Sequence, residues 1–569
     1  MIFRTLAAVG LASLFTFSGQ AQLPVLKPSD VTFMYQASRS VYETYGATVL
    51  AWGGRPTPES LQTAAGIRFF GSVGMVTEFA RYCERFPTNY EQGLCQDLEG
   101  KPFKVPWLTD HNHKGVPFWW CCTRQPVFRQ YISERVVETV NLGAYGVHID
   151  DHLGTAGALF LGGCFCDLCV KGFPAFLKRS GNTTMADIED YRAALRAFLA
   201  EKSGRKISEH PLWETWRVYQ LRGAAQFMSE LKDLAAKTGT RPVPMSANAC
   251  LLWGPHLSDY QTLDFFSAEI DHHASAKQLS AAPVVAYRIA DAVGRPLAST
   301  ASGGDWAFIK ASGRHGLVRS WIALGYAAGN CIMAPNHQWC YTPEKGTHWY
   351  EGPTEQFAPL YRFVRDHADL FDGYQNHADL TVVYSQKTYD LEPGLLMNLC
   401  ERLSKENISY RLQLGGDAVV DHPLSLERLR EAKRAILLKR KDFTEADARV
   451  LAQLDSRQCF EEVEKALQGL SPAVQLDLPR NVRLFPRSKP SGAVIHLVNW
   501  DYDAEKDSVR TIPDVGVKLD LQALGVKGAA TARWLVPGQE PKVLAIAGGK
   551  IVVPELPTWG VLELKRANR

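Results

Sequence analysis

Two short apolar segments of the chain end in carboxylate side chains. The segment YGVHID ends in Asp150 and is followed by Asp151, and the segment DFFSAEI carries Glu269 and is followed by Asp271. Cleavage of a glycosidic bond generally needs two carboxyl groups that face each other across the bond, one protonated and one ionised. These four carboxylates are therefore the candidate catalytic residues.

Strand periodicity separates neighbouring carboxylates, because successive side chains of a strand point to opposite faces. In GVHID, Gly146 and His148 share a face with Asp150, and the two apolar residues between them share the other face. In FFSAEID, the same count places Glu269 and Asp271 on one face. We predict Asp150 as the nucleophile or base and Glu269 as the general acid, with Asp271 as the nearest alternative.

Structural roles compete with these assignments. Asp150 and Asp151 could cap the following turn or orient a neighbour, and Glu269 could be a salt-bridged residue of the core. Two adjacent carboxylates repel each other, so one of the two aspartates could stay protonated, as an acid requires. Burial in an apolar strand would likewise raise the pKa of Glu269.

The chain has 12 Cys, and three of them form the cluster CFCDLC. Cys164, Cys166 and Cys169 are too close in sequence for unstrained disulfides with one another, but their thiolates can converge on one tetrahedral Zn²⁺. The fourth ligand would come from Cys122 or its neighbour Cys121. The alternative is a set of oxidised or merely buried cysteines.

From about residue 31 to 370, short β-branched or apolar runs alternate with helical stretches, which is typical of a (β/α)8 barrel. A doubly wound sheet is the alternative, but no G-x-G-x-x-G follows any of these runs. In such barrels the catalytic groups lie at the C-terminal ends of the strands. The expected strands are 31–36 or 48–53, 67–73, 116–121, 145–150, 242–248, 264–270, 296–302 and 331–337, and the expected helices are 126–141, 171–179, 213–238, 278–293 and 314–328.

Two further domains are expected after the barrel. Residues 379–386, 409–414 and 435–440 form strand-like runs with helical segments between them, which predicts a small α/β domain with a parallel sheet. The last hundred residues carry short, turn-rich strands typical of a β-sandwich. The expected divisions are a signal peptide at 1–21, the barrel at 22–372, the α/β domain at 373–472 and the β-sandwich at 473–569.

The chain is rich in aromatic side chains, which make up 11% of its residues and include 14 Trp. Tryptophan suits stacking on the flat apolar face of a sugar ring, and two or three near strand ends are expected to do so. Asparagine and aspartate at strand ends would bind sugar hydroxyls. The candidate substrate-binding residues are Trp52, Trp119, Asn248, Asp305, Trp306, Asn336 and Trp339.

The N-terminus and the composition limit the possible location and partners of the protein. Residues 1–21 contain one basic residue, an apolar run and small residues up to Ala21, which predicts a cleaved secretory signal and a secreted or periplasmic protein. Export permits disulfides, and Cys83 with Cys95 is the closest candidate pair. The net charge of +3 gives no basic field for nucleic acid. No other stretch reaches about 18 apolar residues, so membrane insertion is not expected.

Four stretches resemble the glycoside hydrolase family 42 β-galactosidases: CTRQPVFR from Cys122, YGVHIDDHLG, CFCDLCVKGFPAFLKR and RSWIALGYAAGNC. The resemblance implies a structural zinc on Cys122, Cys164, Cys166 and Cys169. It also implies a flavodoxin- or amidotransferase-like domain that forms trimers in that family, followed by a terminal β-domain. The expected partners are a carbohydrate substrate and other copies of the chain, and no organic cofactor is expected.

The chain departs from that family at both catalytic positions. The family's Asn-Glu pair after the fourth strand, whose Glu is the general acid/base, corresponds to Asp151 and His152. The family's nucleophilic Glu at the seventh strand corresponds to STASGGDW, which has no Glu. We therefore expect an exported glycoside hydrolase with a different carboxylate pair. The alternatives are a carbohydrate-binding protein on a degenerate barrel, or a metal-dependent hydrolase that uses His272 and His273.

Overall fold

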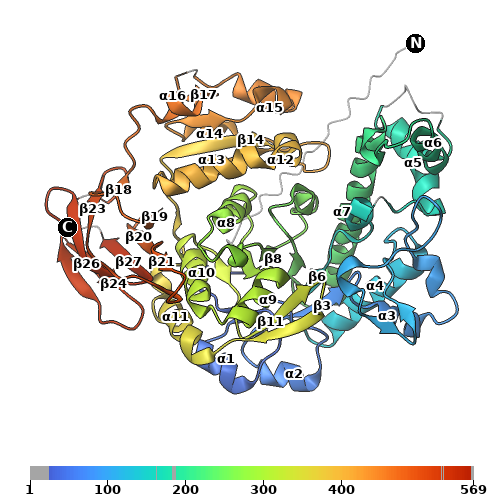
Figure 1. Cartoon of the computed structure of the whole chain (residues 1–569), viewed down its shortest axis with the longest axis horizontal. Coiled ribbons are helices and arrows are strands. Elements are labelled where there is room, and N and C mark those ends of the chain that lie inside the picture. Colours follow the sequence, from blue (N-terminus) through green and yellow to red (C-terminus); the bar gives the residue numbers. More distant parts are fainter. Residues whose placement is uncertain are drawn as a thin grey trace, which may run out of the picture.

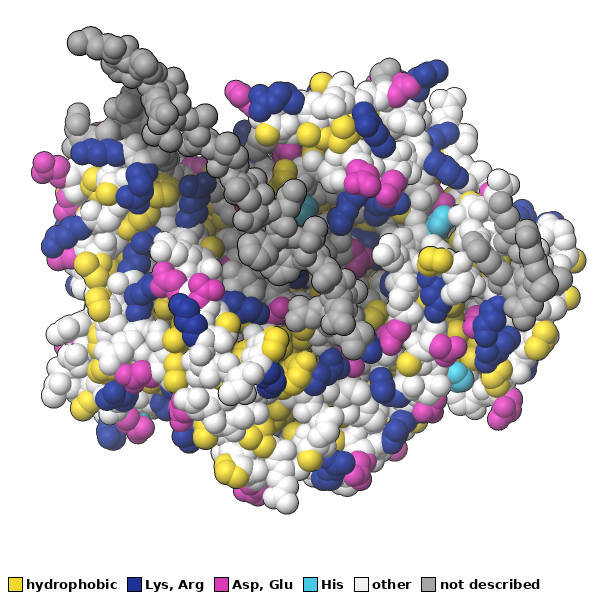
Figure 2. All heavy atoms as spheres, turned by 180° about the vertical axis from the view of Figure 1, so that it is seen from behind, with side chains coloured by type: hydrophobic (Ala, Val, Ile, Leu, Met, Phe, Trp, Pro, Cys, Tyr) yellow, Lys and Arg dark blue, Asp and Glu magenta, His cyan; other side chains and the backbone are white. Residues whose placement is uncertain are grey.

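A computed structural model describes residues 25–161, 163–181, 188–455, 457–526, 528 and 531–565. Its core is a barrel, with an α/β domain (orange) on one side and a β-sandwich (red) on another (Figure 1). The expected signal peptide at 1–21 lies outside the described residues. None of the described helices is long and apolar enough to cross a bilayer. Basic and acidic side chains are interspersed over the face shown in Figure 2.

Eight parallel strands form the barrel, in chain order around the sheet. A hydrogen bond from Ala334 N to Thr32 O (2.7 Å) joins the last strand region to the first. This arrangement confirms the predicted (β/α)8 fold. The strands are β1 (Thr32–Phe33), β2 (Val49–Leu50), β3 (Arg68–Gly74), β6 (Gly146–Asp150), β7 (Met245–Asn248), β8 (Phe265–Ile270), β9 (Leu297–Ala301) and β10 (Cys331–Ile332).

One expected barrel strand is wrong, and two expected alternatives are both strands. The run at 31–36 contains β1 and the run at 48–53 contains β2. The run at 116–121 is not a barrel strand, because its two-residue strand β5 (Val116–Pro117) pairs antiparallel with β4 (Asn112–His113) in the loop after β3. This loop is apolar because it packs over the barrel mouth, where Trp120 is buried.

The side chains of the barrel strands alternate between two apolar clusters. Phe70 of β3 and Phe265 of β8 belong to the cluster inside the barrel. Val147 and Ile149 of β6 belong to the main cluster, which includes the surrounding helices. Asp150 therefore shares the inward face of β6, as the strand parity predicted.

Helices surround the barrel and meet the predicted ranges closely. Helix α4 begins at Pro126, a residue that favours the first turn because its fixed φ is helical and its missing N–H needs no partner. Helix α7 packs along α4 (Figure 1). The barrel helices are α1 (Arg39–Tyr45), α2 (Pro58–Thr63), α3 (Phe79–Arg85), α4 (Pro126–Asn141), α7 (Trp213–Thr238), α8 (Ala282–Ala292), α9 (Gly303–Ser312), α10 (His315–Ala327) and α11 (Thr354–Asp366).

Two excursions extend the C-terminal rim of the barrel. After β6, the chain forms the 3-10 segment η3 (Gly154–Leu161) and then α5 (Asp167–Arg179) and α6 (Tyr191–Ala200). After β10, it forms a hairpin of β11 (His337–Thr342) and β12 (Gly346–Glu351). These excursions supply side chains that the barrel strands are too short to carry.

The α/β domain has a parallel four-stranded sheet with the order β15-β14-β16-β17. Its buried apolar strands alternate with short helices, as a parallel sheet covered on its faces requires. The strands are β14 (Leu380–Ser385), β15 (Tyr410–Gly415), β16 (Ala435–Leu437) and β17 (Cys459–Phe460), and the helices are α12 (Gln386–Leu391), α13 (Pro393–Lys405), α14 (Leu426–Arg430), α15 (Glu445–Leu451) and α16 (Val463–Leu467).

The described part of the C-terminal region contains a six-stranded sheet, a three-stranded sheet and a short hairpin of β21 (Tyr502–Asp503) and β22 (Ser508–Val509). Strand β13 (Gln375–Asn376), which directly follows the barrel, pairs with β19 of the sandwich before the chain enters the α/β domain. The domain divisions at 372 and 472 stay a prediction. The other sandwich strands are β18 (Val474–Leu476), β19 (Val482–Lys489), β20 (Gly492–Asn499), β23 (Ile512–Leu519), β24 (Thr531–Leu535), β25 (Lys542–Ala545), β26 (Lys550–Leu556) and β27 (Trp559–Lys565).

Candidate active site

A cavity of about 750 Å³ lies at the C-terminal ends of the barrel strands. Asp150 ends β6, Asn248 ends β7 and Glu269 lies one residue before the end of β8. Asn248 Nδ2 donates to Asp150 Oδ1 (3.4 Å) and to Glu269 Oε2 (3.3 Å). One amide nitrogen therefore bridges the two carboxyl groups.

Burial changes the proton affinity of both carboxyl groups. Burial raises the pKa of Asp150 to about 6, although the hydrogen bonds from Asn248 and Thr77 lower it. Burial, followed by the charge of Asp150, raises the pKa of Glu269 to about 7. A carboxyl pair whose proton affinities lie near neutrality can hold one proton between two groups, which is the state that acid–base chemistry on an acetal needs.

The other two candidate carboxylates have different positions. Asp151 lines the cavity with a backbone φ of +52°, a left-handed conformation that aspartate tolerates better than most residues. Burial and the charges of Asp150 and Glu269 raise the pKa of Asp151 well above its usual range. Asp271 lies beyond the end of β8, outside the cavity lining, and its half-exposed side chain pairs with His273 (3.2 Å).

Glu78 and Thr77 also line the cavity, and both were absent from the predicted site. Glu78 Oε2 accepts from Tyr131 Oη (2.7 Å) and from Arg135 Nε (2.7 Å), so an arginine compensates its charge. Thr77 Oγ1 donates to Asp150 Oδ2 (3.3 Å). Thr77 and Glu78 lie three and four residues after the end of β3, and a polar pair in the loop after a strand was the available signal.

Aromatic side chains form the walls of the cavity. Of the predicted sugar-stacking residues, Trp52 follows β2 and Trp339 lies on β11, and both line it. A Cβ atom at Gly303 would lie 2.5 Å from the Trp339 ring, so the glycine lets α9 pass beneath this ring. The other aromatic residues that line the cavity are Tyr35, Trp107, Phe118, Trp120, Phe160, Trp253 and Trp349.

Four predicted substrate-binding residues lie outside the cavity lining. Trp306 is buried, and its Nε1 donates to Thr300 Oγ1 (3.0 Å). Asp305 is buried and accepts from backbone N–H groups of the loop after β8. Trp119 precedes Trp120 but is not among the lining residues, and Asn336 accepts from Gly352 N through its backbone carbonyl.

Loss of an aromatic wall should weaken substrate binding. Trp253 is 41% exposed in this structure and open for stacking. We expect Trp253→Ala and Trp339→Ala each to raise KM roughly tenfold, equivalent to about 1.4 kcal/mol. Trp119→Ala is the control, because that ring lies outside the cavity. Initial rates over a range of substrate concentration measure the effect, and an unchanged KM in both cavity variants would argue against stacking.

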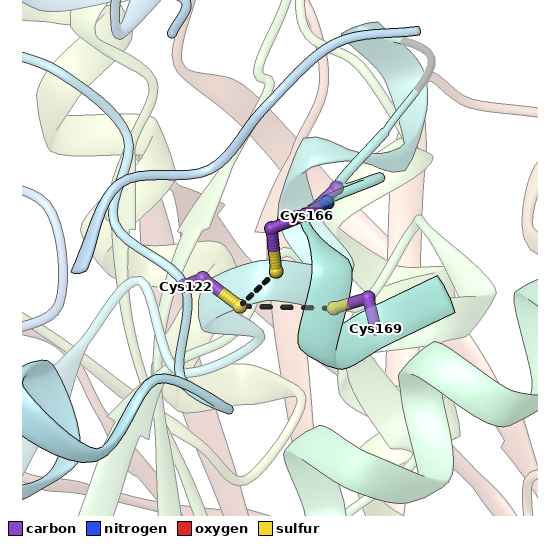
Figure 3. A group of neighbouring side chains, drawn as sticks. Cys122, Cys166 and Cys169 are labelled. Atoms are coloured by element: carbon purple, nitrogen blue, oxygen red, sulfur yellow. Dashed lines mark hydrogen bonds between the residues drawn. The ribbon is translucent and has the colours of Figure 1, made fainter. Parts of the chain in front are cut away.

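Four buried cysteines converge beside the barrel: Cys122, Cys164, Cys166 and Cys169, whose sulfur atoms all lie within 4.8 Å of one another. Cys122 Sγ lies 3.7 Å from Cys166 Sγ and 3.7 Å from Cys169 Sγ (Figure 3). Two Zn–S bonds of about 2.3 Å at a tetrahedral angle place their sulfur atoms about 3.8 Å apart. The sulfur geometry therefore fits a tetrahedral metal ion.

The elements around the cysteines hold this geometry. Cys166 is the N-cap of α5 and Cys169 lies in the first turn of that helix, where the helix dipole favours thiolates. Gln220 of α7 donates to the carbonyl of Cys164 (3.2 Å). The expected Cys83–Cys95 disulfide is wrong, because both thiols are free.

The histidine-based metal site has no third ligand. His272 is buried and its ring lies against Trp321, whereas His273 is exposed. Within the described residues, the four cysteines are the one cluster of at least three side chains that could hold a metal.

Comparisons with known proteins find distant relatives in sequence and similar structures in fold. No family model matches the chain. An α-agarase from Alteromonas agarilytica is 22% identical over 609 aligned residues, which cover 95% of this chain and 41% of that enzyme. An α-agarase from Thalassotalea agarivorans is 20% identical and covers 96% and 40%. The chain thus spans about two fifths of the length of these relatives.

Solved structures match the fold. The β-galactosidase from Bacillus circulans sp. alkalophilus superposes with a TM-score of 0.60 at 12% identity, over 95% of this chain and 99% of that one. A GH42 β-galactosidase from G. stearothermophilus carrying the E323A substitution superposes with a TM-score of 0.57 at 11% identity, over 94% and 98%. The chain therefore resembles the GH42 β-galactosidases in fold over nearly its whole length.

Proposed function

We propose that the chain is a glycoside hydrolase that uses Asp150 and Glu269 as its catalytic pair. The observation that carries the proposal is the joint hydrogen bonding of these two carboxyl groups to Asn248, at the base of an aromatic cavity. Glu269 would donate its proton to the leaving oxygen. Asp150, whose pKa is the lower of the two, would act as the nucleophile or as the base for water.

The positions that correspond to the family's catalytic glutamates support this reassignment. His152, at the position of the general acid/base, is buried and bonded to Asp259 (2.8 Å). After β9, the chain turns into α9, and no residue of this turn lines the cavity. The carboxylates of β6 and β8 that line the cavity, Asp150 and Glu269, are therefore the pair that we propose.

We propose a galactose-containing oligo- or polysaccharide as the substrate. The support is indirect: the relatives are named for agar and the solved structures for β-galactosides, and both are galactose-containing carbohydrates. The cavity of about 750 Å³ and its several aromatic walls offer room for more than one sugar ring.

Product release from defined substrates tests the proposal. The purified chain is incubated with agarose, agarotetraose, and p-nitrophenyl α- and β-galactosides, with cellulose and starch as controls. Release of reducing ends or nitrophenol supports a glycosidase and names its class. Agarotetraose binding without release would favour the carbohydrate-binding alternative.

The pKa values of the pair predict a bell-shaped pH profile. The base must be ionised and the acid protonated, so activity should fall as Asp150 gains a proton below about 6 and as Glu269 loses its proton above about 7. The two groups interact, so the profile reports the pair. Measurement of kcat/KM against pH checks this, and Glu269→Gln should lose the alkaline limb. An alkaline limb that persists in this variant would assign the acid elsewhere.

Three further features belong to the same proposal. The metal on the four cysteines would be Zn²⁺ with a structural role, since all four ligand positions are filled by protein thiolates. The signal peptide predicted at 1–21 would direct the chain to a secreted or periplasmic location, where polymeric substrates are accessible. The resemblance to family 42 supports a homotrimer, which light scattering of the purified chain would detect.

A further inference from the structure

Three buried side chains, Asp259, His152 and His256, form a hydrogen-bonded row that ends at the cavity. His152 Nδ1 lies 2.8 Å from Asp259 Oδ2, and His152 Nε2 lies 2.9 Å from His256 Nδ1. Asp259 and His152 are almost fully buried, whereas His256 lines the cavity. These two hydrogen bonds use both ring nitrogens of His152 and Nδ1 of His256. His256 Nε2 is therefore the last atom of this hydrogen-bonded row.

The chemistry of the three groups sets the direction of their hydrogen bonds. A carboxylate only accepts, so His152 must carry its proton on Nδ1. The Nε2 of a neutral His152 then accepts, and His256 must donate from Nδ1. A neutral His256 therefore has a bare Nε2. Burial lowers the pKa of His256 well below its usual range, in agreement with a neutral ring.

The aromatic ring of Trp253 lies beside the ring of His256. Trp253 precedes the single turn η5 (Gly254–Leu257), and His256 N donates to Trp253 O (3.1 Å). The two ring centroids are 4.9 Å apart, and Trp253 is exposed. A sugar ring stacked on Trp253 would place its hydroxyl groups at the edge, where His256 stands.

The loop that carries these residues is fixed from outside the barrel. Tyr260 Oη donates to Asp421 O (2.9 Å) of the α/β domain. A Cβ atom at Gly254 would lie 2.1 Å from Asp390 Oδ1 of α12, so the turn is pressed against that helix. The position of His256 is thus set by two domains.

We propose that Asp259 and His152 fix His256 as a hydrogen-bond acceptor for a substrate hydroxyl, in a sugar subsite whose platform is Trp253. His256 is a specificity-determining binding residue, and Asp259 and His152 are positioning residues. The inference rests on the proposed glycosidase function for its substrate. The direction of the hydrogen bonds, however, can be measured without turnover.

The first experiment measures the tautomer of His256 by ¹⁵N NMR of the full chain labelled at histidine. The His256→Gln variant assigns the signals. We expect the proton on Nδ1 and a bare Nε2, and in Asp259→Asn we expect the other tautomer to become populated, because an amide can also donate to His152. A wild-type ring protonated on Nε2 would overturn the proposal.

The second experiment separates binding from chemistry with agarotetraose and p-nitrophenyl β-galactoside. His256→Ala should raise KM about tenfold and leave kcat unchanged, because a lost hydroxyl contact weakens ground and transition states alike. His256→Gln should recover part of the affinity, since its amide oxygen can accept at the position of Nε2. His210→Gln, a buried histidine outside the cavity lining, is the matched control.

The outcomes are distinguishable from a failure of the proposed function. A lower kcat with unchanged KM in His256→Ala would overturn the inference and indicate a structural role. If wild type turns over neither probe, the proposed function fails, and calorimetric binding of agarotetraose takes the place of KM. Equal binding by wild type and His256→Ala would then overturn the subsite.

Discussion

Asp150→Asn and Glu269→Gln should each lower kcat by roughly 10²–10⁴-fold or more, the usual range for loss of a general acid or base. Each substitution keeps the size of the side chain and its hydrogen bond to the Asn248 region. Glu269→Gln removes the proton that the general acid donates, and Asp150→Asn removes the carboxylate that acts as nucleophile or base. The fold should be unchanged, which circular dichroism checks. Asp271→Asn, at the residue that directly follows the strand and lies outside the cavity lining, should retain wild-type kcat.

The leaving group separates the roles of the two carboxyl groups. A dinitrophenolate leaving group needs no proton from the enzyme. Glu269→Gln should therefore recover much of its rate on a dinitrophenyl glycoside. Asp150→Asn should stay inactive on it, because attack at the anomeric carbon is still required. The opposite pattern would exchange the two roles. Wild-type rates in both variants would remove the pair from the mechanism.

Loss of the cysteine-bound metal is the second large effect. Metal analysis of the purified chain should give one zinc per chain, and Cys166→Ser should abolish its binding. We expect the substitution to cost about 5 kcal/mol of unfolding free energy, below the roughly 10–16 kcal/mol of isolated zinc modules, because the surrounding barrel remains packed. A fall of the Tm by roughly 4–7 °C would follow, because the unfolding entropy grows with the size of the unit that unfolds.

The control for this prediction is Cys83→Ser, which changes a buried thiol outside the cluster. It should retain the zinc and lose little stability. The cluster lies beside the barrel and supplies none of the residues that line the cavity, so a chelator should lower activity only as the chain unfolds. Disulfides among the four cysteines and no bound metal would contradict the account.

Strand parity found the central carboxylates because it is a local property. Asp150 and Glu269 lie within regular strands, where the alternation of faces holds. The same count failed to distinguish Asp271, since β8 ends at Ile270 and the chain turns outward there. Parity is informative only as far as the strand continues.

The walls of the cavity were less predictable, because loops position them. The run VPFWWC is as apolar as a buried strand, yet it covers the barrel mouth and presents Trp120, not Trp119, to the cavity. The hairpin that carries Trp339 and Trp349 had a signal in Gly346, whose φ of +61° suits the turn between two aromatic runs.

The hydrogen-bonded row of Asp259, His152 and His256 had no sequence signal. His152 is separated from His256 and Asp259 by about a hundred residues, and the three meet because β6 and β7 are neighbours in the barrel. His152 was noticed only as a departure from the family's glutamate. In the structure, the side chain at this position is hydrogen-bonded to a loop and does not line the cavity, so it cannot act on a substrate there.

The most direct test of the account is the release of sugar from galactose-containing substrates by the wild-type chain and by the Asp150→Asn, Glu269→Gln double variant. The account predicts steady release by wild type, best between pH of about 6 and 7, and none above background by the double variant. Equal release by both proteins would contradict it, because the chemistry would then take place without the carboxylate pair.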